Sequence, residues 1–136
     1  MRKRAKIFVA GVSQRTTNAS GVGVLMILNG RVFEISRPIG YAIKDEVVGA
    51  AIEVGLVEAQ NHDVEFVDVY VPSRKIVNML CKGKVENRSG VWKNVIELLG
   101  QFDHYTINFI QKKDNKIANE LAHHASDISL AWMMSP

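Results

Sequence analysis

A switch from strand-like to helical periodicity near residue 40 most constrains how this chain can fold. Before the switch, apolar runs at residues 7–12 and 21–28 and an alternating run at residues 31–37 predict three strands. Asn29-Gly30 joins the second and third runs, and this dipeptide strongly favours a tight hairpin turn. Pro38 should end the third strand because proline donates no backbone hydrogen bond. The first third of the chain is therefore predicted to be an antiparallel meander.

After the switch, predicted helices are interspersed with single strands. Helices are expected over residues 43–59, 74–81, 91–102 and 115–126. Strands are expected over residues 64–71 and 105–111. Because a strand that follows a crossover helix usually runs parallel to its neighbour, the fold class is α/β, with a mixed five-stranded sheet and helices on both faces.

The length of 136 residues predicts one domain over residues 1–128, followed by an apolar tail over residues 129–136. In the last helix, Ile117, Leu121 and Ala125 should form the buried stripe. The tail has five apolar residues in six positions, and such side chains are costly to leave in water. It should either fold back on the domain or dock on a second copy or another protein.

Cysteine content and hydropathy bear on where the protein acts. Cys81 is the only cysteine, so no internal disulfide can form, and this favours a reducing, cytoplasmic location. No apolar run approaches the roughly 18–20 residues of a membrane-spanning helix, so no membrane partner is expected.

Charge is segregated along the chain although the net charge is only +3. Residues 1–44 hold eight Lys or Arg and one acid, residues 45–71 hold seven acids and no base, and residues 72–93 hold six bases and one acid. Basic segments that flank an acidic one are typical of a surface that meets phosphates, although ordinary solvated faces give similar counts.

Four pieces of sequence, in order, resemble the type 1 ribonuclease H family over roughly residues 5–126. They are Ile7-Phe8-Val9-Ala10-Gly11-Val12-Ser13 with Gly21-Val22-Gly23-Val24; Glu46 with Ala51-Ile52-Glu53-Val54-Gly55-Leu56; Val69-Tyr70-Val71-Pro72-Ser73 with Val77-Asn78; and Asn115, Ala118, Leu121 and Ala122. The resemblance implies a ribonuclease H-like fold.

The family's chemistry requires four carboxylates that hold a pair of magnesium ions. By the resemblance, those four positions are Ala10, Val48, Pro72 and Asn119 here. The first three offer no ligand atom, and Asn119 offers at most one neutral carbonyl. We therefore expect no metal, no cofactor and no catalysis, and a domain that resembles an enzyme without being one.

A shifted set of acids is the main alternative, because Asp45, Glu46, Asp68, Asp114 and Glu120 lie near the vacated positions in the sequence. Glu46 precedes Val48 by two residues, which places it about 200° round a helix. Asp68 lies four residues, roughly 13 Å, from the strand end at Pro72. A residual metal-dependent ribonuclease thus remains an alternative with poor geometry.

A nucleic-acid surface can persist without the metals. The resemblance implies contacts from the first turn, where Ser13, Gln14, Arg15, Thr16 and Asn18 keep polar groups. Phosphate contacts are further expected from basic side chains: Lys44, Arg74, Lys75, Lys82, Lys84, Arg88 and Lys93. Trp92 would be a stacking residue if it is not buried. The favoured function is binding of an RNA–DNA hybrid or duplex by a catalytically silent domain. The alternative is a protein-interaction or assembly module on the same fold.

Overall fold

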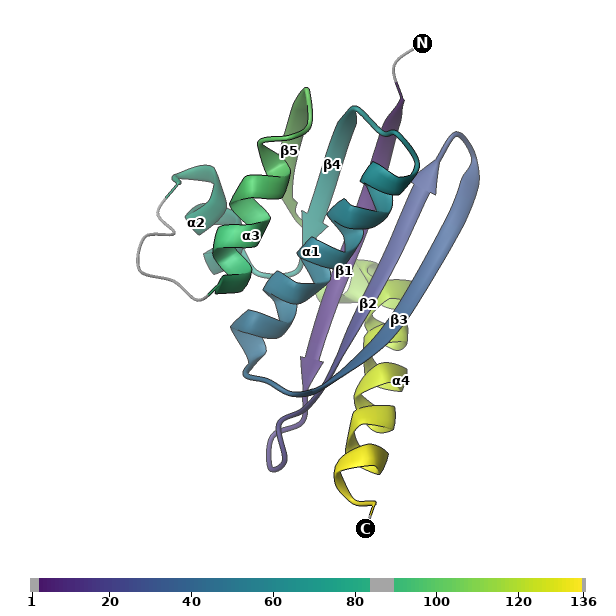
Figure 1. Cartoon of the computed structure of the whole chain (residues 1–136), viewed down its shortest axis with the longest axis vertical. Helices are drawn as coiled ribbons and strands as arrows, with labels where there is room; N and C mark the ends of the chain where they lie inside the picture. Colours follow the sequence, from purple (N-terminus) through teal and green to yellow (C-terminus); the bar gives the residue numbers. More distant parts are fainter. Residues whose placement is uncertain (1–2, 84–89, 136) are drawn as a thin grey trace.

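The computed structural model describes residues 3–83 and 90–135, which form a five-stranded sheet between helices (Figure 1). The strands are β1 (Arg4–Ser13), β2 (Ala19–Leu28), β3 (Arg31–Tyr41), β4 (Phe66–Val71) and β5 (His104–Phe109). The helices are α1 (Lys44–Asn61), α2 (Arg74–Cys81), α3 (Gly90–Leu99) and α4 (Lys116–Met133), with a 3-10 turn, η1 (Lys112–Asp114), before α4. The predicted order of elements and the α/β class are confirmed.

The sheet is mixed, with the spatial order β3-β2-β1-β4-β5. β2 is antiparallel to β1 and to β3, whereas β4 is parallel to β1 and to β5. The carboxyl ends of β1, β4 and β5 therefore meet at one edge of the sheet, which is where the candidate site lies.

Helices cover the two faces unequally (Figure 1). α1 packs on β1 and β2, with α3 beside it and α2 against β4 and β5. This face holds the main core, in which Ile7, Val9 and Val69 meet Ile52 and Leu56 of α1. α4 packs on the other face, over β1, β2 and β3. None of the described helices has the length and apolar character needed to cross a bilayer.

The prediction that Pro38 ends the third strand is wrong. β3 continues to Tyr41, and Pro38 pairs with Gly21 at a shift of register between Ser20 and Gly21. β3 is an edge strand, so a proline there can point its nitrogen away from the neighbouring strand without loss of a ladder hydrogen bond. The irregularity lets the hairpin extend and lead directly into α1.

Of the predicted stripe of the last helix, only Ala125 is buried, so the prediction is wrong for Ile117 and Leu121. α4 buries Ala118, Ala122, Ala125, Ser126 and Ser129, while Ile117 is 46% exposed. The reason lies in β2: a Cβ placed on Gly21 or Gly23 would overlap the α4 backbone. The helix approaches so closely that only small side chains fit between it and the sheet, which hydrophobic periodicity cannot indicate.

Beyond Ser126, where the sequence predicts its end, α4 continues to Met133. The Ser129 hydroxyl fixes this extension, since it donates to the Ser20 carbonyl at 2.6 Å and accepts from the Gly40 amide at 3.0 Å. Trp132 and Met134 are 62% and 75% exposed. The fold-back alternative is therefore wrong for these two side chains, which remain in solvent.

Candidate functional site

A cleft of about 840 Å³ opens at the carboxyl ends of β1 and β4, between the first turns of α1, α2 and α4. It collects residues that are far apart in the chain because the parallel strands end at the same edge. The lining residues are Ala10, Gly11, Val12, Ser13, Arg15, Lys44, Asp45, Val48, Pro72, Ser73, Ile76, Lys112, Asn115, Asn119 and His123.

The four positions singled out in the sequence, Ala10, Val48, Pro72 and Asn119, all line this cleft. Four different elements bring them together: β1, α1, the end of β4 and α4. Their correspondence to metal ligands still rests on the resemblance, but their convergence is an observed property of the fold.

The donor set of the cleft does not fit a pair of divalent cations. Asp45 is the one carboxylate among the lining residues named above, and its Oδ2 accepts from Lys75 Nζ at 2.6 Å. Across residues 3–83 and 90–135, no three His, Cys, Asp or Glu side chains gather into a metal-binding group. Magnesium needs several anionic oxygens, so no metal-dependent step can be derived for these residues.

Cationic side chains surround the cleft instead. Arg15 comes from the turn after β1, Lys44 from the first turn of α1 and Lys112 from η1, and all three are exposed. With Asp45 paired to Lys75, the cleft is electropositive and suits phosphate groups. Arg15 and Lys44 were expected from the sequence, and Lys112 was missed.

His123, which was not among the predicted site residues, also lines the cleft. It lies ten residues before the end of α4, where it shares one helix face with Asn119 and Asn115 at four-residue spacing. Lys112 follows the carboxyl end of β5, which the parallel topology brings to the same edge. The four-residue spacing and the position of Lys112 after the last strand are visible in the sequence. They indicate a shared site only when the order of the strands in the sheet is known.

Asn115 joins the start of α4 to the middle of the sheet. It is 3% exposed, and its Nδ2 donates to the Val9 carbonyl at 2.8 Å, next to Ala10. Its Oδ1 is buried without a hydrogen-bond partner among the described residues. The α4 N-terminus is thereby held against β1, which fixes Asn119 and His123 at the cleft.

The predicted polar turn is only partly at the cleft. Ser13 and Arg15 line it, although the Ser13 hydroxyl is engaged with the Ala42 carbonyl at 2.7 Å. Gln14 instead reaches α4, where its Nε2 donates to Ser126 Oγ at 2.9 Å. Asn18 takes a positive φ of 56° to close the turn, and Thr16 is exposed away from the lining set.

The remaining basic residues expected at phosphates have mixed placements. The Arg74 guanidinium lies over the Phe109 ring at 4.0 Å, and Lys75 is paired with Asp45. Lys82 and Lys93 are exposed, whereas Lys84 and Arg88 lie outside the described residues. Trp92 is 4% exposed and packs against Gly49 of α1, so the condition for a stacking role, an unburied side chain, is not met.

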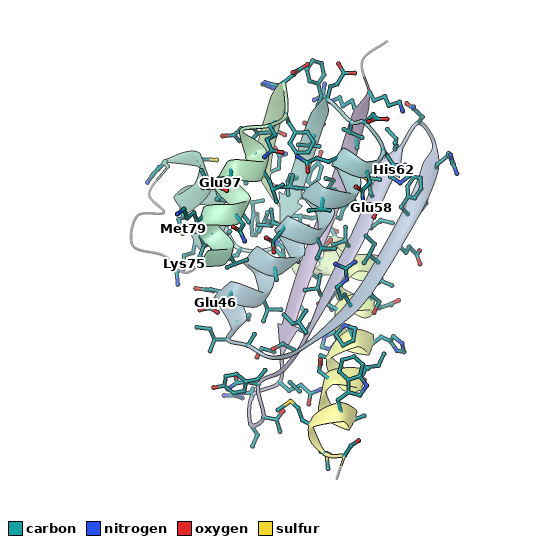
Figure 2. All side chains as sticks on the ribbon, in the orientation of Figure 1. Glu46, Glu58, His62, Lys75, Met79 and Glu97 are labelled. Carbon is teal, nitrogen blue, oxygen red and sulfur yellow. The ribbon has the colours of Figure 1, made fainter. Side chains whose placement is uncertain are left out.

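None of the alternative acids except Asp45 lines the cleft. Glu46 lies on the first turn of α1 (Figure 2) and is not among the residues that line the cleft. Asp68 is on β4 and accepts from Arg4 Nε at 2.7 Å, Arg4 Nη2 at 3.0 Å and Thr106 Oγ1 at 2.7 Å. The geometry therefore gives no support to a shifted carboxylate set, and Asp68 has a structural role.

Asp68 should contribute to stability in a pH-dependent way. The hydrogen bonds from Arg4, with smaller help from Thr106, hold the pKa of Asp68 below its ordinary 3.8 against the opposing effect of burial. A lowered folded-state pKa gives stability that is present above the unfolded pKa and lost as the pH falls through the folded one. We expect Asp68→Ala to lower the free energy of unfolding by about 2 kcal/mol at neutral pH, measured by urea denaturation.

The same titration supplies the internal check. As the pH falls below 3.8 and then through the lower folded-state pKa, Asp68 becomes protonated in the folded protein as well, and the difference between Asp68→Ala and wild type should shrink. Asp103→Ala, an exposed acid in the turn before β5, serves as the control and should change stability little. A difference from wild type that is constant with pH would show that the ion pair contributes nothing.

Comparisons with known proteins give one consistent result. A family model described as reverse transcriptase-like matches residues 8–125. No curated protein sequence matches the chain. Among solved structures, RNase H1 from the halophilic archaeon Halobacterium salinarum is 22% identical, with a TM-score of 0.81 over 92% of this chain and 98% of that one.

Two further structures extend this likeness. The N-terminal RNase H domain of a Mycobacterium tuberculosis protein is 19% identical, with a TM-score of 0.86 over 96% of this chain and 99% of that one. LC11-RNase H1, solved in complex with an RNA/DNA hybrid, is 20% identical, with a TM-score of 0.80 over 93% and 99% of the two chains. These similarities establish the ribonuclease H-like fold.

Proposed function

The chain belongs to the reverse transcriptase-like family, and from that membership we propose that it is a ribonuclease H-like domain that binds nucleic acid without cleaving it. The observation that carries the proposal is the cleft. Ala10, Val48 and Pro72 line the cleft and carry no carboxylate, whereas Arg15, Lys44 and Lys112 contribute positive charge to its lining. LC11-RNase H1 shows that a chain of this fold can hold an RNA/DNA hybrid.

The chemistry of such binding follows from the charges. Arg15, Lys44 and Lys112 can each neutralise a phosphate, and no cluster of carboxylates is present at the described cleft to repel the backbone. Contacts to phosphates carry no sequence information and release counterions. The domain should therefore bind hybrid or duplex with weak sequence preference and with an affinity that falls steeply as salt is raised.

One experiment tests both halves of the proposal. We expect a labelled RNA–DNA hybrid to be retained in anisotropy measurements at low salt and to stay intact in millimolar magnesium or manganese. The comparison variant restores Ala10→Asp, Val48→Glu, Pro72→Asp and Asn119→Asp together. Its four carboxylates should bind magnesium, seen as a rise in melting temperature with added metal that wild type lacks.

Two results would contradict the proposal. Metal-dependent turnover that persists through extensive purification and disappears in Asp45→Asn would favour a residual ribonuclease. No retention of any nucleic acid at low salt would favour the second candidate, a module for protein assembly. The exposed Trp132, Met133 and Met134 at the end of α4 are the observation that favours this second candidate.

A further inference from the structure

The sheet has a region without helix cover on the face where α4 lies. α4 packs on β1, β2 and β3, and no described helix packs on this face of β4 or β5. The strand register places three rows of side chains here: Arg4, Phe66 and His104; Lys6, Asp68 and Thr106; and Phe8, Tyr70 and Asn108. We call these nine residues the open sheet face.

Aromatic rings and polar groups share the open sheet face. The Phe8 and Tyr70 rings are stacked, with their centroids 4.7 Å apart and their planes at 11°. Both side chains are only partly buried. Phe8 also packs against the α4 residues Ala118 and Ala122, so it anchors the pair.

Tyr70 is only partly buried, and Phe8 stacks on one face of its ring. Tyr70 is paired with Phe8 of β1 on one side and with Asn108 of β5 on the other, and the Phe8 ring covers the β1 side of the Tyr70 ring. Asn108 is the neighbour on the β5 side, and its Nδ2 donates to Thr106 Oγ1 at 2.8 Å and to the Val69 carbonyl at 3.4 Å. A flat ring with an amide beside it is the arrangement on which single-stranded bases stack and form hydrogen bonds.

The open sheet face also continues into the cleft. Phe8 precedes Ala10 by two residues on β1, so both lie on the same face at a separation of roughly 7 Å, and Tyr70 lies next to the end of β4, which Pro72 follows. The positive charge beside the rings comes from Lys6, which is exposed, because the accessible Arg4 is paired with Asp68. The face thus joins an electropositive cleft to an aromatic surface.

We propose that the open sheet face is a stacking platform for single-stranded nucleic acid, with a base seated on Tyr70 beside Asn108 and the flanking phosphates in the cleft. This inference rests on the proposed function for the class of ligand, nucleic acid, and adds a preference for single-stranded over duplex nucleic acid. A duplex keeps its bases paired and cannot use the ring, whereas a single strand can use both the ring and the cations.

The test compares a labelled oligothymidylate with a duplex of the same length by anisotropy at low salt. Tyr70→Leu keeps an apolar contact for Phe8 but removes the ring, and it should weaken single-strand binding about five- to hundredfold. Duplex binding should be unchanged. Tyr70→Phe should bind as wild type does, and Tyr105→Leu, on the other face of the sheet, is the matched control.

The outcomes separate the two proposals. Normal single-strand binding by Tyr70→Leu, with weakened binding by Lys112→Glu, would overturn the platform and leave the cleft in place. Equal losses for single strand and duplex, or failure of Tyr70→Phe to restore binding, would likewise overturn the platform. If wild type binds neither ligand, both proposals fail and a protein partner for this face becomes the better explanation. Melting temperatures show whether each variant is folded.

Discussion

Gly23→Ala should destabilise the domain strongly. A Cβ at this position would overlap the Ala118 carbonyl oxygen and come within 2.6 Å of the Ala122 amide nitrogen. Both are backbone atoms of α4, so no side-chain rotation can relieve the overlap. α4 would have to lift from β2 and give up the close contacts of Ala118, Ala122 and Ser126. Overpacking of this kind costs up to about 3 kcal/mol, a large part of a small domain's stability.

Urea denaturation of Gly23→Ala and of a matched glycine variant measures this effect. Gly90→Ala is the control, because a Cβ there meets no atom of residues 3–83 or 90–135 within 4 Å and the residue has no positive φ. We expect Gly90→Ala to change the free energy of unfolding by less than about 0.5 kcal/mol. A Gly23→Ala protein as stable as Gly90→Ala would show that α4 does not sit on β2 as described.

Charge reversal at the cleft should have the largest effect on binding. Lys44→Glu combined with Lys112→Glu removes two cations from opposite sides of the cleft and adds two anions. Each lost phosphate contact should reduce the slope of log affinity against log salt by about 0.7–0.9, which is roughly tenfold in affinity at 50 mM salt. We therefore expect a loss on the order of a hundredfold for the double variant, measured by titration of hybrid or duplex over a series of salt concentrations.

Lys113→Glu is the sharpest control for the charge reversal. Lys113 is adjacent to Lys112 in η1 and equally exposed, but it is not among the residues that line the cleft. Reversal of the Lys113 charge alters the net charge of the protein but not the charge of the cleft lining. Its effect on the affinity for nucleic acid should therefore be small at moderate salt. Equal effects of Lys112→Glu and Lys113→Glu would indicate diffuse attraction to a basic protein instead of a defined cleft.

Local patterns in the sequence were sufficient for the order and type of the strands and helices. Alternation of apolar residues, the Asn29-Gly30 turn and the helical spacing after residue 43 are short-range signals, since each depends on neighbours within one strand or one turn. The absence of acids at Ala10, Val48 and Pro72 is likewise a property of the sequence once the family resemblance aligns it.

Tertiary contacts decided which of these residues meet and which surfaces remain open. Gly21 and Gly23 select the small-residue face of α4, although Ile117 and Leu121 fit the helical period as well. Lys112 and His123 join the cleft because β1, β4 and β5 end at one edge, and Trp92 is removed from solvent by Gly49. These outcomes depend on steric fit and strand order between residues that are distant in the chain, and no local pattern records either of them.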